Sequence, residues 1–201
     1  MTVEDPGAPA ADNGEFWLFG YGSLIWKPPP HFASYREVSN MGHRVLSSQD
    51  HRGTPEAPGR VVTLIERSFW ETLPDPHSAA DKVWGVAYRI KADHVEEVKE
   101  YLDIREINGY TIHYTPFCPA SSPEKPIRTL VYIGTPDNDQ FVGPQDIQAL
   151  AEHICRSEGP SGLNRDYLLG LDEALQELSP ESGDEHVTDL SERVRAIMSR
   201  E

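Results

Sequence analysis

The sequence predicts an α+β fold in which a curved or closed sheet is flanked by helices. Short runs rich in Val, Ile, Tyr and Thr dominate the first two thirds of the chain, whereas amphipathic helical patterns fill the last third. The length of 201 residues suits one domain that buries its own core. We therefore expect a disordered extension at residues 1–15, rich in Pro, Ala, Gly and acids, followed by one domain over residues 16–201.

Six segments are predicted to be strands, because β-branched and aromatic residues cluster there in short runs. They are residues 16–19, 38–46, 60–65, 83–90, 110–117 and 127–133. Between the third and fourth of these, residues 67–82 contain Pro74 and Pro76 and follow no periodic pattern. That segment is predicted to form an exposed loop.

The first helix is predicted from a capping signal, Asp93 followed three residues later by Glu96. Its core-facing residues are Val95, Val98 and Leu102. The Asn-Gly pair at residues 108–109 can end this helix, since both residues tolerate the left-handed conformation.

Three more helices are predicted in the last third of the chain, each from an apolar stripe at helical spacing. The stripes are Ile147, Leu150, Ala151, Ile154 and Cys155; Tyr167, Leu168, Leu171, Leu175 and Leu178; and Val187, Leu190, Val194 and Ile197. Asn164 and Asp184 are the expected N-caps of the last two helices.

Composition excludes several classes of partner. The formal net charge of −15 argues against nucleic acid and anionic membranes as main partners. No apolar stretch approaches the roughly 20 residues that span a bilayer, and the first residues do not resemble a signal peptide. We therefore expect a soluble, cytoplasmic protein that acts on a small molecule, and the sequence carries no signal of an oligomeric state.

Metal and disulfide chemistry are not indicated. The two cysteines, Cys118 and Cys155, form no C-x-x-C pair, so neither a disulfide framework nor a zinc cluster is expected. The eight histidines show no H-x-x-x-H, H-x-H or H-E-x-x-H spacing, so no preformed metal site is predicted.

A glycine-containing turn is the first candidate for chemistry. An apolar strand delivers Gly20, Tyr21, Gly22, Ser23, Leu24 and Ile25, which can direct backbone N–H groups and a hydroxyl toward one point. Such a turn suits a carboxylate or a developing oxyanion. Phosphate-binding and G-x-S-x-G nucleophile motifs do not fit the spacing. The alternative is an ordinary strand end with a glycine turn.

Glu106 is the second candidate, because of its position in the helical repeat. It follows Leu102 by four residues, on the face that otherwise goes to the core. Burial raises the pKa of a carboxyl group, which then both accepts and donates protons near neutral pH. The alternative is an ion pair between Glu106 and a nearby arginine at the helix end.

Three other side chains are weaker candidates for binding an anionic substrate. Arg52 and Arg60 can supply positive charge from the loop before the third strand, or they form ordinary surface ion pairs. Tyr167 starts a core stripe, although its hydroxyl group needs a partner and can meet a ligand.

Several segments, taken in order, resemble the ChaC family of γ-glutamylcyclotransferases. They are residues 19–27, 50–53, 58–64, 83–89, 101–110, 132–134 and 159–162. The resemblance implies a small mixed-strand barrel, closed or partly closed, with flanking helices. It also implies cofactor-independent cleavage of glutathione into 5-oxoproline and cysteinylglycine. In this family the position of Glu106 is the acid/base, and the turn from Gly20 to Ile25 receives the γ-glutamyl group.

Two alternatives to glutathione cleavage stay open. One keeps the chemistry and changes the substrate to γ-glutamyl amino acids or γ-glutamyl amines. The other is a non-catalytic module that binds a γ-glutamyl compound. Glu106 disfavours this second alternative, because a buried carboxylate gives a pure binder no advantage.

Overall fold

The computed structural model describes residues 14–41, 43–48, 52–74, 82–105, 110–138 and 141–200. Its main strands are β1 (Phe16–Gly20), β2 (Phe32–Met41), β3 (His43–Ser48), β4 (Val61–Glu66), β5 (Lys82–Ile90), β6 (Tyr110–Phe117) and β7 (Ile127–Gly134). The α-helices are α1 (Arg67–Trp70), α2 (Val95–Arg105), α3 (Ile147–Arg156), α4 (Asn164–Leu178) and α5 (Glu185–Met198). Two 3-10 turns, η1 (Gly22–Ile25) and η2 (Ala92–His94), and a small hairpin of β8 (Glu158–Gly159) and β9 (Gly162–Leu163) complete the described elements.

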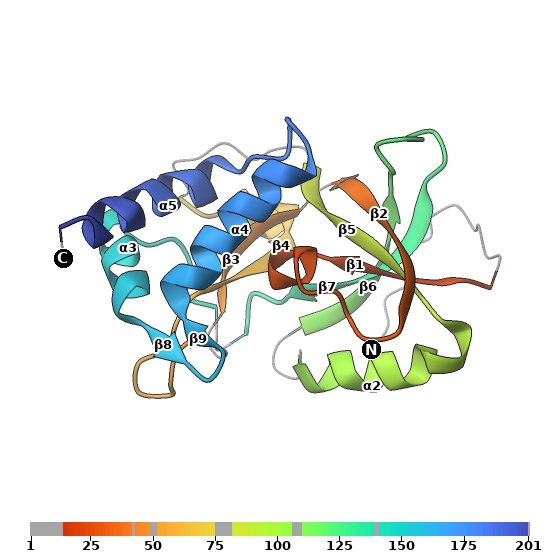
Figure 1. Ribbon diagram of the computed structural model, residues 1–201, viewed down its shortest axis with the longest axis horizontal. Helices are drawn as coiled ribbons and strands as arrows, with labels where there is room; N and C mark the ends of the chain where they lie inside the picture. Colours follow the sequence, from red (N-terminus) through yellow and green to blue (C-terminus); the bar gives the residue numbers. More distant parts are fainter. Residues whose placement is uncertain are drawn as a thin grey trace.

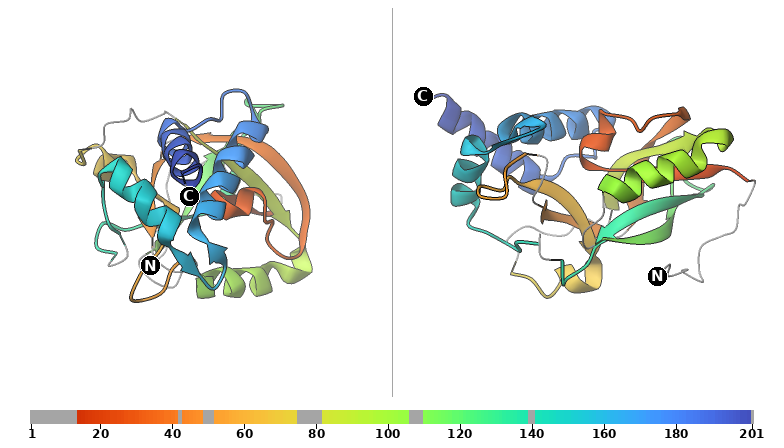
Figure 2. Two further views of the ribbon diagram at one scale, coloured as in Figure 1. Left: turned by 60° about the vertical axis from the view of Figure 1, so that its left-hand side comes forward. Right: turned by 90° about the horizontal axis from the view of Figure 1, so that it is seen from below.

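The seven main strands form one mixed sheet in the order β1-β5-β2-β6-β7-β4-β3. Most neighbours are antiparallel, but β7 runs parallel to β4 and also to β1. Helices α3, α4 and α5 gather at one end of the molecule, while α2 lies apart near the other end (Figure 1). The view from below shows the same separation (Figure 2).

The α+β class with flanking helices is confirmed. Of the predicted closed or partly closed barrel, the closed form is wrong. The sheet curls far enough for β1 to meet β7, yet this contact consists of one register pair, Leu18 with Leu130. The contact between β2 and β6 is also a single pair, Asn40 with Phe117. Among the described strands β3 pairs only with β4, so it leaves an edge. Such short ladders do not close the sheet into a barrel.

Strand β1 is buried on both faces, which explains its continuous apolar sequence. Trp17 and Phe19 pack with Phe117 and neighbouring residues on one face. Leu18 packs on the other face, in the cluster that also holds Val98 and Leu102 of α2. Helix α2 therefore buries the face that its sequence pattern predicted.

The three C-terminal helices form a core of their own, built from the stripes that the sequence predicted. Asp184 caps α5 as expected, because its carboxylate accepts from the amides of His186 and Val187. Asn164 was wrong as an N-cap: it is the first residue of α4, and its side chain bonds the backbone of Arg60 instead. In the described part of the chain, no helix combines the length and apolar character needed to cross a membrane.

The predicted start of the first helix and the predicted loop at residues 67–82 differ from the structure in part. The capping signal at Asp93 does not start an α-helix, because η2 precedes α2 and its N-cap residue is Lys91, without a capping side chain. The segment predicted as a loop from residue 67 begins with the short helix α1, and residues 75–81 lie outside the described part. The assignment of residues 1–15 and 16–201 to an extension and one domain stays a prediction.

Candidate active site

The glycine turn follows β1 directly. Tyr21 is extended, and η1 then turns the chain through Gly22 to Ile25. The amide of Leu24 donates to the Tyr21 carbonyl oxygen at 3.2 Å, and that of Lys27 donates to Ser23 O at 2.8 Å. Within the described residues, no protein group accepts from the amides of Gly22 or Ser23. Two backbone donors of this turn are thus available to an anion, whereas that of Leu24 is used in closing the turn.

Gly22 is required by both its conformation and its surroundings. Its φ of +58° lies in the left-handed region, where a residue with a Cβ is disfavoured. A Cβ built there would lie 2.9 Å from Cγ2 of Val62 and 3.0 Å from the hydroxyl oxygen of Tyr167. The turn is therefore pressed against β4 and α4, and Figure 1 draws it beside α4.

We expect Gly22→Ala to lower both stability and catalytic efficiency. Left-handed backbone costs alanine about 1–2 kcal/mol, and the new methyl group also displaces Val62 or Tyr167. A misplaced turn is expected to reduce kcat/KM about ten-fold or more, measured as 5-oxoproline release from glutathione. Gly143→Ala is the matched control, since Gly143 also has a positive φ, of 63°, but its nearest Cβ contact is at 4.0 Å. Equal kinetics for the two variants would contradict a role for the turn.

Tyr167 lies beside the turn, as a candidate site residue should. It is 6% exposed, and its hydroxyl oxygen accepts a hydrogen bond from the Val62 amide at 3.2 Å. Its ring packs against Trp26, with 5.8 Å between ring centroids. Tyr167 therefore joins α4, the start of β4 and the residue that follows η1.

The structure brings Arg52 to the same place, but its contacts are with the protein. It is 7% exposed, and Nη1 donates to the carbonyl oxygen of Leu163 at 2.9 Å. The guanidinium carbon lies 5.7 Å from the centroid of the Tyr167 ring. Arg52 thus supports Tyr167 and β9, and a direct contact with substrate stays a prediction.

Arg60 holds the backbone in place rather than forming a surface ion pair. Its side chain donates to Gln145 and to the carbonyl oxygens of Pro58 and Gly59, each at 3.0 Å. Burial lowers the pKa of the Arg60 guanidinium from its usual value. The amide and carbonyl groups of Arg60 are both bonded to the side chain of Asn164, at 2.7 and 2.6 Å. Asn164 is fully buried and fixes β4 against α4.

Tyr88 is a positioning residue that the sequence did not single out. It lies on β5 and donates from its hydroxyl group to the carbonyl oxygen of Leu24 at 2.6 Å. Burial, together with repulsion from Tyr35, raises the pKa of Tyr88 to about 12. Tyr88 therefore remains a protonated donor across the physiological range. Its ring also packs against Gly20, where an added Cβ would lie 2.9 Å from Cε2 of Tyr88 and from Leu24 Cβ.

Of the predicted site residues, the structure gathers the turn, Arg52 and Tyr167. Tyr21 stands beside β7, with its hydroxyl group donating to Tyr132 O at 3.3 Å. Ile25 packs against the core that includes Tyr167. Glu106 lies outside the described residues, and α2 ends at Arg105, directly before it. The register that predicts a core-facing Glu106 is confirmed as far as Leu102, which is 2% exposed.

The chain matches the model of a known protein family. A family model described as ChaC-like protein matches residues 16–197. This chain therefore belongs to the ChaC family, and the resemblance seen in its motifs is confirmed.

Individual relatives agree with the family assignment. The chain is similar to the glutathione-specific γ-glutamylcyclotransferase of Schizosaccharomyces pombe, with 42% identity over 195 residues, which cover 94% of this chain and 96% of the relative. It is 34% identical over 192 residues to human glutathione-specific γ-glutamylcyclotransferase 1, covering 93% and 82% of the two chains. A crystal structure of a γ-glutamyl cyclotransferase specific to glutathione from yeast superposes with a TM-score of 0.79. It is 35% identical, and the match covers 90% of this chain and 96% of that one.

Proposed function

We propose that this protein is a glutathione-specific γ-glutamylcyclotransferase, a cofactor-independent lyase that degrades glutathione to 5-oxoproline and cysteinylglycine. The observation that carries this proposal is the 42% identity, over 94% of the chain, to a relative named for that activity. The glycine turn supports it, because backbone amide donors suit the carboxylate or oxyanion of a γ-glutamyl group.

The proposed reaction is an intramolecular substitution. The α-amine nitrogen of the γ-glutamyl group bonds to the γ-carbonyl carbon, and the bond from that carbon to the cysteine nitrogen breaks. Bending the substrate brings nucleophile and electrophile together, and effective molarities for such reactions reach about 10⁵ M or more. The protein then has two tasks: to hold the bent substrate and to move protons.

Glu106 is the proposed proton carrier. An α-amine has a pKa of about 8, so most of it is protonated at neutral pH and cannot attack. Glu106 takes that proton and delivers it to the nitrogen of the departing cysteinylglycine, which leaves poorly as an anion. The amides of Gly22 and Ser23 are the proposed donors to the α-carboxylate or to the oxyanion of the tetrahedral intermediate.

The test is a direct assay of substrate choice. Purified protein is incubated with reduced glutathione and, separately, with γ-glutamylalanine at the same concentration, and 5-oxoproline is measured by chromatography. We expect turnover of glutathione and at least about ten-fold lower kcat/KM with γ-glutamylalanine, as a site built for cysteinylglycine predicts. If γ-glutamylalanine were turned over faster than glutathione, the proposed substrate would be wrong, but the proposed cyclisation would stand. Tight binding of glutathione without any product would support the non-catalytic module instead.

The cytoplasm is the proposed compartment. The sequence holds only two cysteines, Cys118 and Cys155, and indicates no disulfide framework, as is typical of proteins in reducing compartments. The net charge of −15 keeps nucleic acid an unfavourable partner, so the small-molecule substrate is the proposed main ligand.

A further inference from the structure

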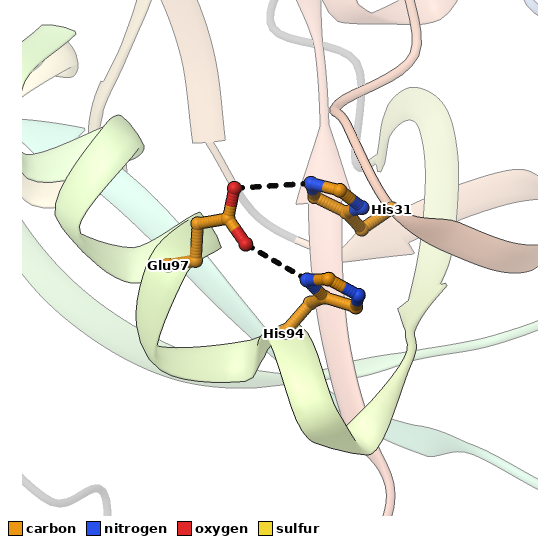
Figure 3. Close-up of side chains that lie close together, drawn as sticks. All are labelled: His31, His94 and Glu97. Atoms are coloured by element: carbon orange, nitrogen blue, oxygen red, sulfur yellow. Dashed lines mark hydrogen bonds and ion pairs between the residues drawn. The ribbon is translucent and has the colours of Figure 1, made fainter.

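Two histidines and a glutamate meet on the surface next to α2 (Figure 3). His31 lies between η1 and β2, His94 ends η2, and Glu97 lies in the first turn of α2. His31 Nε2 is 3.1 Å from Glu97 Oε1, and His94 Nδ1 is 2.8 Å from Glu97 Oε2. The two imidazole rings stack 3.8 Å apart at an interplanar angle of 1°. One donor atom from each residue falls within a group no wider than 4.8 Å.

We propose that His31, His94 and Glu97 form a binding site for a divalent transition-metal ion of the zinc class. Two imidazole nitrogens and one carboxylate oxygen are ligands that zinc accepts, and three protein ligands leave a fourth position open to water. Ligand atoms about 2.1 Å from a tetrahedral metal lie about 3.4 Å from one another. In the structure the two histidines face different oxygens of Glu97, at 3.1 and 2.8 Å, and their rings are parallel. One imidazole therefore has to rotate, and the side chains have to move slightly apart, before both ring nitrogens face one ion.

The backbone of His31 supports this inference. Its φ of 58° is the only positive value for a residue other than glycine in the described part of the chain. Such a conformation costs about 1–3 kcal/mol, and it persists where the surroundings determine it. The carbonyl oxygen of His31 accepts from the Lys91 amide at 3.1 Å, which fixes the strained residue beside η2. A backbone held under strain aims this imidazole at Glu97.

The surroundings of the three side chains suit a cation. Oδ2 of Asp93 lies 3.7 Å from Nε2 of His94, the nitrogen that faces away from Glu97. At this distance the Asp93 carboxylate adds negative charge beside the three side chains without a hydrogen bond to the ring.

Sequence spacing does not reveal this group, because its members are brought together by the fold. His94 and Glu97 are three residues apart on one helical turn, but His31 precedes Glu97 by 66 residues. A bound metal would connect α2 to the segment that follows the glycine turn. The inference does not depend on the proposed function, and its test measures binding rather than activity.

The test is a zinc titration of the full-length chain, prepared without a histidine tag and freed of metal with a chelator. Isothermal titration calorimetry with zinc chloride is expected to show one saturable site. Removing one ligand in His94→Gln, Glu97→Gln or His31→Gly is expected to weaken zinc binding at least about ten-fold. Glycine is chosen at His31 because it adopts a positive φ without strain. Circular dichroism of each metal-free variant checks that the fold is kept.

Glu96→Gln is the matched control. Glu96 lies in the same helical turn and pairs with Lys99 at 2.9 Å, outside the proposed ligand set. This variant is expected to bind zinc as the wild type does, and zinc is expected to raise Tm in both but not in His94→Gln. Three results would overturn the proposal: no saturable binding by the wild type, unchanged binding in His31→Gly and His94→Gln, or equal loss of binding in Glu96→Gln.

Discussion

Replacing Glu106 by glutamine is expected to lower the turnover of glutathione by two or more orders of magnitude. Glutamine keeps the size and hydrogen-bonding capacity of the side chain, but it can neither take a proton from the α-amine nor deliver one to the leaving nitrogen. General acid/base catalysis contributes about 10²–10⁴-fold in rate, and this residue is proposed to act in both directions. The measurement is kcat for 5-oxoproline release under saturating glutathione.

The same variant is expected to bind glutathione, which separates proton transfer from binding. Calorimetry on Glu106→Gln should give a Kd within about three-fold of the wild-type KM, because the turn and its two amides are unchanged. Glu100→Gln is the control: Glu100 is an exposed carboxylate on α2, and its loss should leave kcat unchanged. A Glu106→Gln protein with near wild-type turnover would refute the assignment.

Gly53→Ala is expected to have the largest effect on stability, lowering the free energy of unfolding by about 3 kcal/mol or more. A Cβ at Gly53 would overlap the backbone nitrogen of Gly59 and lie 2.6 Å from the carbonyl oxygen of Ala57. These are backbone atoms, so no side-chain rotation relieves the clash. Arg52, the preceding residue, would move with Gly53 and lose its contact with Leu163. Urea unfolding followed by circular dichroism measures the effect.

Gly183→Ala is the matched control for this prediction. Gly183 is exposed, and a Cβ there would meet no atom within 4 Å. Alanine at such a position is expected to be neutral or to stabilise by about 0.4–1 kcal/mol, through the unfolded chain. If Gly53→Ala unfolded at the same urea concentration as Gly183→Ala, the close packing of residues 52–59 would be refuted.

Elements with a strong local pattern could be predicted from the sequence. Short runs of β-branched and aromatic residues located most of the strands, but residues 38–46, predicted as one strand, fall into two, β2 and β3. The spacing of Val98 and Leu102 identified the buried face of α2. The glycine turn was predicted because its two glycines follow an apolar strand directly. In each case the physical cause, a periodicity or a backbone requirement, lies within a few neighbouring residues.

The remaining features depend on contacts between segments that are distant in the sequence, and local sequence patterns do not predict such contacts. Asn164 looked like a helix cap, since its residue type favours that role, but its amide group bonds both backbone groups of Arg60. Tyr88 lies in a segment that the sequence predicts only as a strand, yet its hydroxyl group donates to the carbonyl oxygen of Leu24 in η1. Closure of the sheet was wrongly predicted for a related reason. The lengths of the strands predict neither the register between two strands nor how many residue pairs join them.

The contacts of the glycine turn have a consequence for how the protein folds. Its strand, β1, pairs with β5 and β7, and Gly22 rests against Tyr167 of α4. Hydrogen bonds between positions 105 to 111 residues apart join Tyr167 to Val62, Arg52 to Leu163 and Tyr21 to Tyr132. Contacts of such long sequence separation form slowly, because a long loop has to close first. During synthesis, the turn is therefore expected to reach its final shape only after α4 has left the ribosome. When the unfolded chain refolds, activity should likewise be among the last properties to return.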